Sequence, residues 1–137
     1  MIRSVSINAK VMVTYLNKDS RKRLGDEGEA IASQYLISLG YHIKNKQWRC
    51  RSGEIDLIAM DQDVWVFIEV RTRHISNHYG KAKESITYHK QRKVREIAQY
   101  YMYVHQLFDP KIRFDCVSVE WYPAMKDPQI ELVQGAF

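Results

Sequence analysis

Two apolar runs in the middle of the chain are separated by three polar residues. The runs span Ile55 to Met60 and Val64 to Val70, and Asp61-Gln62-Asp63 lies between them. Runs of this length, rich in isoleucine and valine and joined by a short polar turn, are typical of two strands in a β-hairpin. The pattern therefore predicts a hairpin at the centre of the fold.

A helical pattern precedes this hairpin. Ile31, Tyr35 and Leu39 recur at a spacing of four, which predicts one apolar helix face. The predicted helix begins at Leu24 or Gly25 and ends at Leu39, where Gly40 provides a stop signal. A helix that begins there has Asp26 and Glu27 in its first turns, where their charges suit the helix dipole.

The other predicted elements complete an α-β-β-β-α-β order with a further short strand at the end. They are a strand over Tyr41–Ile43, a connection over Lys44–Ser52, a helix from about Glu84 to Leu107, and strands over Ile112–Trp121 and Ile130–Val133. This order predicts the α/β class, with a mixed central sheet flanked by helices.

Length and composition indicate one folded domain. The chain has 137 residues, of which 45% are hydrophobic. Residues 21–137 are predicted to form the domain, and residues 1–20 form an amino-terminal extension. No apolar run is long enough for a membrane span. Cys50 and Cys116 lack the spacing of a metal site or disulfide scaffold, so we expect free thiols in the reducing cytoplasm.

The chain is basic, with a net charge of +5 and an isoelectric point of about 9.2. Such an excess suits a polyanionic partner, most simply nucleic acid, although many soluble domains are equally basic. The basic residues are densest in the connection over Lys44–Ser52, where Lys44, Lys46, Arg49 and Arg51 surround Trp48. Cations beside an aromatic ring suit phosphate contacts and base stacking, and they are also common in a solvated turn.

Charged residues occupy unusual positions in the hairpin. Asp56 lies inside the first apolar run, and Glu69 and Arg71 lie at the end of the second. Alternation places Glu69 and Arg71 on one strand face and Glu54 and Asp56 on another, and a hairpin can bring the two pairs together. An unpaired buried carboxylate costs on the order of several kcal/mol. Either a divalent cation with a phosphate compensates for it, or Arg71 pairs with Asp56 or Glu69.

Two histidines follow the hairpin. His74 and His78 are four residues apart, as zinc ligands on a helix can be. The neighbouring Tyr79-Gly80 favours a loop, and no cysteine or third ligand accompanies them, so the sequence does not favour a zinc site.

Several motifs together resemble a known family. They are Gly25-x-x-Gly28-Glu29, Gly53-Glu-Ile-Asp-Leu-Ile-Ala59, Val66-Phe-Ile-Glu-Val-Arg-Thr-Arg73, Lys90-Gln91-Arg92, Arg113-Phe114-Asp115 and Ala136-Phe137. Residues 22–137 resemble the uncharacterised bacterial YraN family, a branch of the restriction-endonuclease-like superfamily related to archaeal Holliday-junction resolvases. The resemblance implies a restriction-endonuclease-like core and a Mg²⁺- or Mn²⁺-dependent endonuclease acting on nucleic acid, DNA more than RNA, with branched DNA as one substrate and a homodimer as one arrangement.

The resemblance also implies roles for individual residues. Asp56 and Glu69 match the two acidic residues of the superfamily signature, the carbonyl of Val70 would complete the metal shell, and Glu29 matches a helix glutamate that reaches the metal. Lys90 matches a basic residue near the substrate phosphate. The side chains expected to contact nucleic acid are Lys44, Lys46, Trp48, Arg49, Arg51, Arg73, Lys90 and Arg92.

One residue departs from the signature, because Arg71 stands where the family pattern has lysine. Arginine can stabilise negative charge on a phosphate, but its pKa is too high for it to lose a proton. The sequence therefore leaves open an active enzyme with Arg71 as its charge stabiliser, a nucleic-acid-binding domain without catalysis, and a protein-interaction module with a structural Arg71 ion pair.

Overall fold

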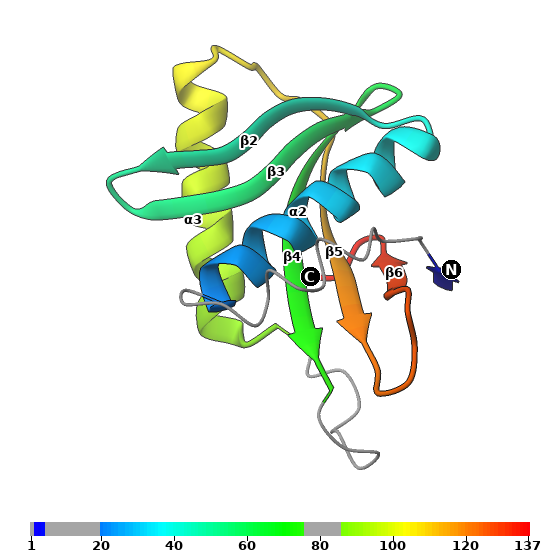
Figure 1. Ribbon diagram of the computed structural model, residues 1–137. Coiled ribbons are helices and arrows are strands. Elements are labelled where there is room, and N and C mark those ends of the chain that lie inside the picture. The colour runs from blue at the N-terminus through cyan, green and yellow to red at the C-terminus, as the bar shows by residue number, and fades with distance from the viewer. Residues whose placement is uncertain (1, 5–19, 76–85) are drawn as a thin grey trace.

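The computed structural model describes residues 2–4, 20–75 and 86–137, which form two helices and a six-stranded sheet (Figure 1). The elements are β1 (Ile2–Ser4), α2 (Ser20–Ser38), β2 (His42–Cys50), β3 (Gly53–Asp61), β4 (Val64–His74), α3 (Tyr88–Val104), β5 (Ile112–Trp121) and β6 (Gln129–Val133). The α/β class and the α-β-β-β-α-β order are confirmed, with β6 as the further strand and β1 added at the sheet edge.

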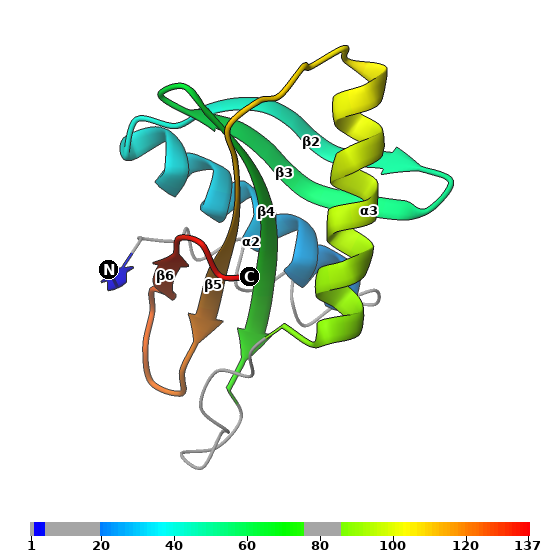
Figure 2. The same ribbon diagram turned by 180° about the vertical axis from the view of Figure 1, so that it is seen from behind.

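The sheet is mixed. Its strand order is β1-β6-β5-β4-β3-β2, and only β4 and β5 run parallel. A parallel neighbour requires a crossover, and α3 lies on it. Figures 1 and 2 show α2 on one face of the sheet and α3 on the other.

Each helix covers its own hydrophobic cluster. The α2 cluster includes Leu36 of the helix with Val66 and Ile68 of β4. The α3 cluster includes Ile97 of the helix with Phe67 of β4. Residues 66, 67 and 68 thus alternate between the two clusters, as strand geometry requires when both faces are covered. No helix in the described part of the chain is long and apolar enough to cross a membrane.

Three predicted boundaries were wrong. Residues 44–50 are not a connection but most of β2, which pairs with β3 along the edge of the sheet. Its alternation is broken by a register shift between Ile43 and Asn45 and by Gln47, which has a positive φ of 49°. An edge strand with one exposed face and two irregularities resembles a polar loop in sequence.

Both helices also begin elsewhere than predicted. Helix α2 begins at Ser20, so Asp26 and Glu27 do not lie in its first turn, and the dipole interpretation of these two residues was wrong. Helix α3 begins after Thr87, whose side chain accepts a hydrogen bond from the Lys90 backbone N–H. It ends at Val104, three residues before the predicted end.

The Arg113-Phe114-Asp115 motif has a structural explanation. Asp115 is fully buried and accepts hydrogen bonds from Arg113 Nε, Tyr41 Oη and the Gly135 backbone N–H. Arg113 also donates to Asp61 Oδ2 at 2.9 Å. This network joins the end of β3 and the carboxyl-terminal segment to β5, so it fixes the closed end of the β3–β4 hairpin.

A glycine sets the distance between α2 and the sheet. A Cβ atom built on Gly28 would lie 2.6 Å from Cγ2 and 2.8 Å from Cβ of Thr72 on β4. These separations are too short for carbon atoms in contact. Helix α2 can therefore lie against β4 at this point only because residue 28 lacks a side chain, and the neighbouring Glu29 is held close to the sheet.

We expect Gly28→Ala to destabilise the fold by about 1–3 kcal/mol, because the added methyl group forces α2 away from Thr72. Gly25→Ala is the matched control, since no atom lies within 4 Å of its built Cβ. Better helix propensity should make the control neutral or more stable by up to about 1 kcal/mol. Urea unfolding of both variants measures the difference. If the two variants were equally stable, the contact between residue 28 of α2 and Thr72 of β4 would not limit the packing of the helix on the sheet.

Candidate functional site

The site lies where β3 separates from β4. The register of this pair runs from Asp61 opposite Val64 to Leu57 opposite Ile68 and goes no further. The next residue of β3 is Asp56, and its Oδ2 accepts a hydrogen bond of 2.9 Å from the Val70 backbone N–H. A carboxylate thus continues the ladder in place of a backbone carbonyl. Beyond it, β3 and β2 extend as a two-stranded arm away from β4 (Figure 1).

Three carboxylates converge at this separation. One oxygen from each of Glu29, Glu54 and Asp56 lies within 4.8 Å of the other two. Glu29 comes from α2, and the other two come from β3. Oxygen ligands at this spacing fit a small hard cation such as Mg²⁺ or Mn²⁺, which prefers carboxylates and retains waters. Glu54 was missing from the predicted site, although its place on the same strand face as Asp56 was a usable signal.

Glu69 approaches from β4. The residue is only 7% exposed, and its Oε1 has no hydrogen-bond partner among the described residues. Its Oε2 lies 3.4 Å from Nζ of Lys90 on α3. The pKa of Glu69 is raised to about 7, first by burial and then by the charge of Asp56, and the charge of Lys90 opposes this shift. A buried carboxylate with one unsatisfied oxygen is a further potential ligand for a cation.

The two other predicted acids are also perturbed. Burial raises the pKa of Glu29 to about 7, and a hydrogen bond from Gln47 opposes this shift. The Gln47 amide donates to Glu29 Oε2 at 2.7 Å, so a residue in left-handed backbone conformation positions the helix glutamate. Burial also raises the pKa of Asp56, against the hydrogen bond from Val70 and the charge of Lys90. Proteins hold such strained and desolvated groups mainly where function requires them.

Arg71 does not complete this group. Among the described residues it forms no ion pair with Asp56 or Glu69, so the expected alternative of a structural pair is wrong for both. Its neighbour on β5 is Ser118. Burial raises the pKa of the Cys116 thiol to about 11, and the Arg71 charge opposes this shift. The carbonyl of Val70 belongs to the residue whose N–H binds Asp56.

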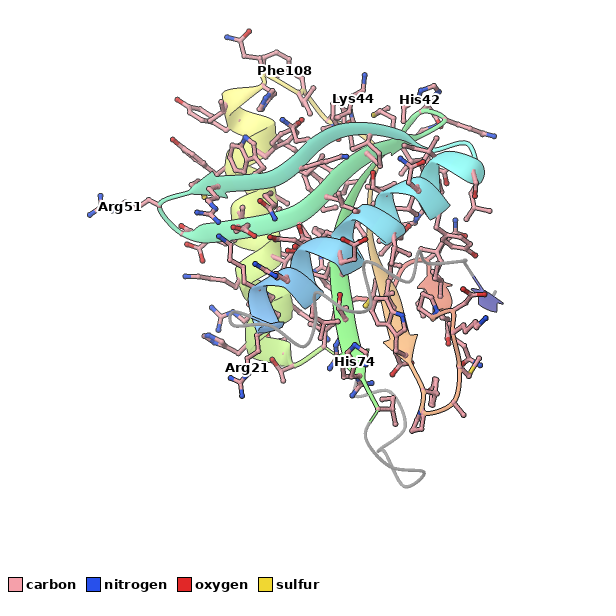
Figure 3. All side chains as sticks on the ribbon, in the orientation of Figure 1. Arg21, His42, Lys44, Arg51, His74 and Phe108 are labelled. Atoms are coloured by element: carbon pink, nitrogen blue, oxygen red, sulfur yellow. The ribbon has the colours of Figure 1, made fainter. Side chains whose placement is uncertain are left out.

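The predicted nucleic-acid residues fall into two groups. Those exposed on β2, on the turn after it and on α3 are Lys44, Lys46, Arg49, Arg51, Lys90 and Arg92. Figure 3 shows Arg51 projecting from the arm, with Arg21 of α2 on the same side of the molecule. The other two residues make internal contacts instead. Arg73 pairs with the buried Glu120 at 3.0 Å. Trp48 packs edge-on against Tyr101, with 5.1 Å between ring centroids.

Among the described residues, no metal site includes a histidine. His74 is the last residue of β4 and stacks on Trp121, with 5.2 Å between ring centroids. His78 lies outside the described residues. Neither cysteine is in a disulfide, and Cys116 is buried.

Comparison with known proteins gives one consistent family. A family model described as "Uncharacterised protein family UPF0102" matches residues 28–119. A UPF0102 protein of Clostridium perfringens strain 13 is 36% identical over 120 residues, covering 88% of this chain and 98% of that protein. Another, from Clostridium botulinum strain Kyoto, is 40% identical over 126 residues and covers 90% and 97%. A third, from Caldanaerobacter subterraneus, is 41% identical over 108 residues and covers 79% and 88%.

The raised pKa of Glu69 predicts a pH-dependent stability. Its ordinary value is 4.5, so between that value and about 7 the folded chain binds more protons than the unfolded chain. Stability should therefore fall as the pH rises through this range. Glu69→Gln removes the titration, and we expect it to stabilise the metal-free protein by roughly 1–3 kcal/mol at about pH 8 and by little at about pH 4.5.

Urea unfolding in a metal chelator across this pH range measures the effect. Glu96→Gln, which removes an exposed carboxylate from α3, is the control and should leave the slope unchanged. Parallel profiles for wild type and Glu69→Gln would contradict the prediction.

Proposed function

The chain belongs to the UPF0102 family, also called YraN, and from this premise we propose that it is a metal-dependent nuclease that hydrolyses phosphodiester bonds of nucleic acid. The observation that carries the proposal is the convergence of Glu29, Glu54 and Asp56 within 4.8 Å at the point where β3 leaves β4. The restriction-endonuclease-like superfamily, with which the α-β-β-β-α-β order is consistent, supports the same reaction class.

Glu29, Glu54 and Asp56 would hold a Mg²⁺ or Mn²⁺ ion, and the unpartnered Oε1 of Glu69 would be an additional ligand. Bound there, the ion would supply the Lewis acidity that phosphodiester hydrolysis needs at neutral pH. The donor set is suitable because it contains only carboxylate oxygens. Without a cation, burial disfavours the charged forms of Glu29 and Glu69 and the neighbouring carboxylates add to this effect, so the pKa values of both are raised to about 7.

The protein's own cations would bind the substrate. Lys46 and Arg51 on the arm and Arg92 on α3 are exposed, and Arg49 pairs with Glu54 at 2.6 Å beside the acidic group. A polyanion bound along these side chains would place a phosphate next to the carboxylates. In the reaction, a water oxygen bonds to phosphorus and the bond from phosphorus to one sugar oxygen breaks. The water loses a proton to solvent, and the leaving oxygen gains one.

A second candidate function is nucleic-acid binding without catalysis, in the same fold. The position of Arg71 favours it, because among the described residues the arginine that replaces the signature lysine forms no ion pair with Asp56 or Glu69. Under this function the basic surface keeps its role, and the carboxylates repel the bound backbone.

Asp56→Asn tests the proposed nuclease. We expect it to weaken Mn²⁺ binding at least about tenfold in calorimetry, because it removes a charged ligand and weakens the acceptor of the Val70 N–H. Cleavage of duplex, single-stranded, flap and four-way DNA should fall at least about 100-fold. Asp63→Asn is the control, since it changes an exposed aspartate in the turn of the same hairpin. Unchanged Mn²⁺ affinity in Asp56→Asn, or wild-type protein that cuts none of these substrates with Mn²⁺, would refute the proposal.

Lys46→Gln tests the basic arm. If Lys46 contacts a phosphate, its removal should reduce DNA affinity and lower the slope of log affinity against log salt by about one. Lys126→Gln is the control, because it removes the same charge from the exposed β5–β6 loop, away from the arm (Figure 1). An identical salt slope in Lys46→Gln and wild type would exclude the arm from the interface.

A further inference from the structure

We propose that Lys90 on α3, and not Arg71 on β4, is the cation that serves Asp56 and Glu69 and stands in for the lysine missing from the strand. The inference rests on the proposed function, since it assigns a part of the same site. In the signature, the lysine follows the second acid by two residues on the same strand. In this chain, the positive charge would instead come from helix α3, which covers one face of the sheet.

The contacts of Lys90 support this assignment. Its Nζ lies 3.4 Å from Glu69 Oε2, and the partner carboxylate is almost fully buried. Its charge also acts on Asp56, where it favours the ionised form. The contact with Glu69 and the electrostatic effect on Asp56 together place one ammonium charge near both acids of the signature, as the strand lysine would be. Among the described residues, no other lysine or arginine forms an ion pair with Glu69.

The position of Lys90 in the helix suits this role. The Lys90 backbone N–H donates a hydrogen bond to the side chain of Thr87, which caps the amino-terminal end of α3. This hydrogen bond fixes the main chain at Lys90. The Lys90 side chain is 50% exposed, so its ammonium group is open to solvent on one side and held to Glu69 on the other. A lysine head group is a compact charge on a flexible stem. It can move from Glu69 to a substrate phosphate when a cation binds the carboxylates.

Arg71 differs from Lys90 in its contacts. It lies on the same strand face as Glu69, and its neighbour across the ladder is Ser118. Among the described residues it forms no ion pair with Asp56 or Glu69. The replacement of lysine by arginine on β4 therefore does not remove the cation from the site, because another element supplies it.

A Mn²⁺ titration by calorimetry separates the two cations without any need for activity. If the Lys90 ammonium competes with metal for Glu69, Lys90→Gln should bind Mn²⁺ about three- to tenfold more tightly than wild type. Arg71→Gln and the control Lys93→Gln, which removes an exposed charge from the same helix, should stay within about twofold. Tighter binding in Arg71→Gln, with no change in Lys90→Gln, would overturn the inference.

Single-turnover cleavage adds a second readout. Lys90→Gln should lower the rate about 100-fold or more, while DNA affinity measured with Ca²⁺ changes less than about threefold, because the lost contact forms mainly in the transition state. A rate loss in Arg71→Gln but not in Lys90→Gln would refute the assignment. If wild-type protein cuts nothing, the proposed nuclease fails, and the Mn²⁺ titration alone decides which cation belongs to the carboxylates.

Discussion

The candidate site depends on a single change of partner at the end of a β-ladder. Up to Leu57 and Ile68, β3 and β4 pair through their backbones. Two residues further along β4, the Val70 N–H instead donates a hydrogen bond to the side chain of Asp56. This substitution satisfies a donor that the separating strand would leave unpaired. It also fixes a carboxylate in a half-buried position between the two helices. The network around Asp115 fixes the other end of the same strand, so the separation occurs at a defined residue.

The same geometry makes the acidic group energetically unfavourable, and this cost indicates that the group has a function. Glu29 reaches it because Gly28 lets α2 lie against Thr72, and Glu69 on β4 contacts Lys90 and is affected by the charge of Asp56. Desolvation raises the pKa of both glutamates. A protein gains no stability from holding several carboxylates in this way. The arrangement is understandable if the fold maintains it for a ligand that carries positive charge, and the exposed basic residues of the arm and of α3 are consistent with a second ligand that carries negative charge.

Part of this could be predicted from the sequence. The hairpin follows from its two apolar runs, and β5 from a partly alternating pattern. Asp56 and Glu69 are conspicuous because they lie inside the apolar runs. Only the beginning of β2 was predicted, as a strand over Tyr41–Ile43, because its bulge and the left-handed Gln47 interrupt the alternation on which strand prediction relies. Periodicity places Glu54 on the same strand face as Asp56, but it could not predict that Glu54 lies close to Glu29 or that Lys90 lies close to Glu69. Their roles depend on the angle at which β3 leaves the sheet and on where α3 crosses it, and both are set by long-range packing.

The arm has a consequence for how the molecule behaves in solution. Strand β2 is an outer strand of the sheet, with one row of backbone donors and acceptors available for another chain. The exposed Lys44 and Lys46 and the kink at Gln47 are the kinds of feature that prevent two such edges from joining. Residues that favour contact with a polyanion thus also oppose β-sheet aggregation. Neutralising several of these charges at once would leave a less charged edge, and the protein would lose solubility.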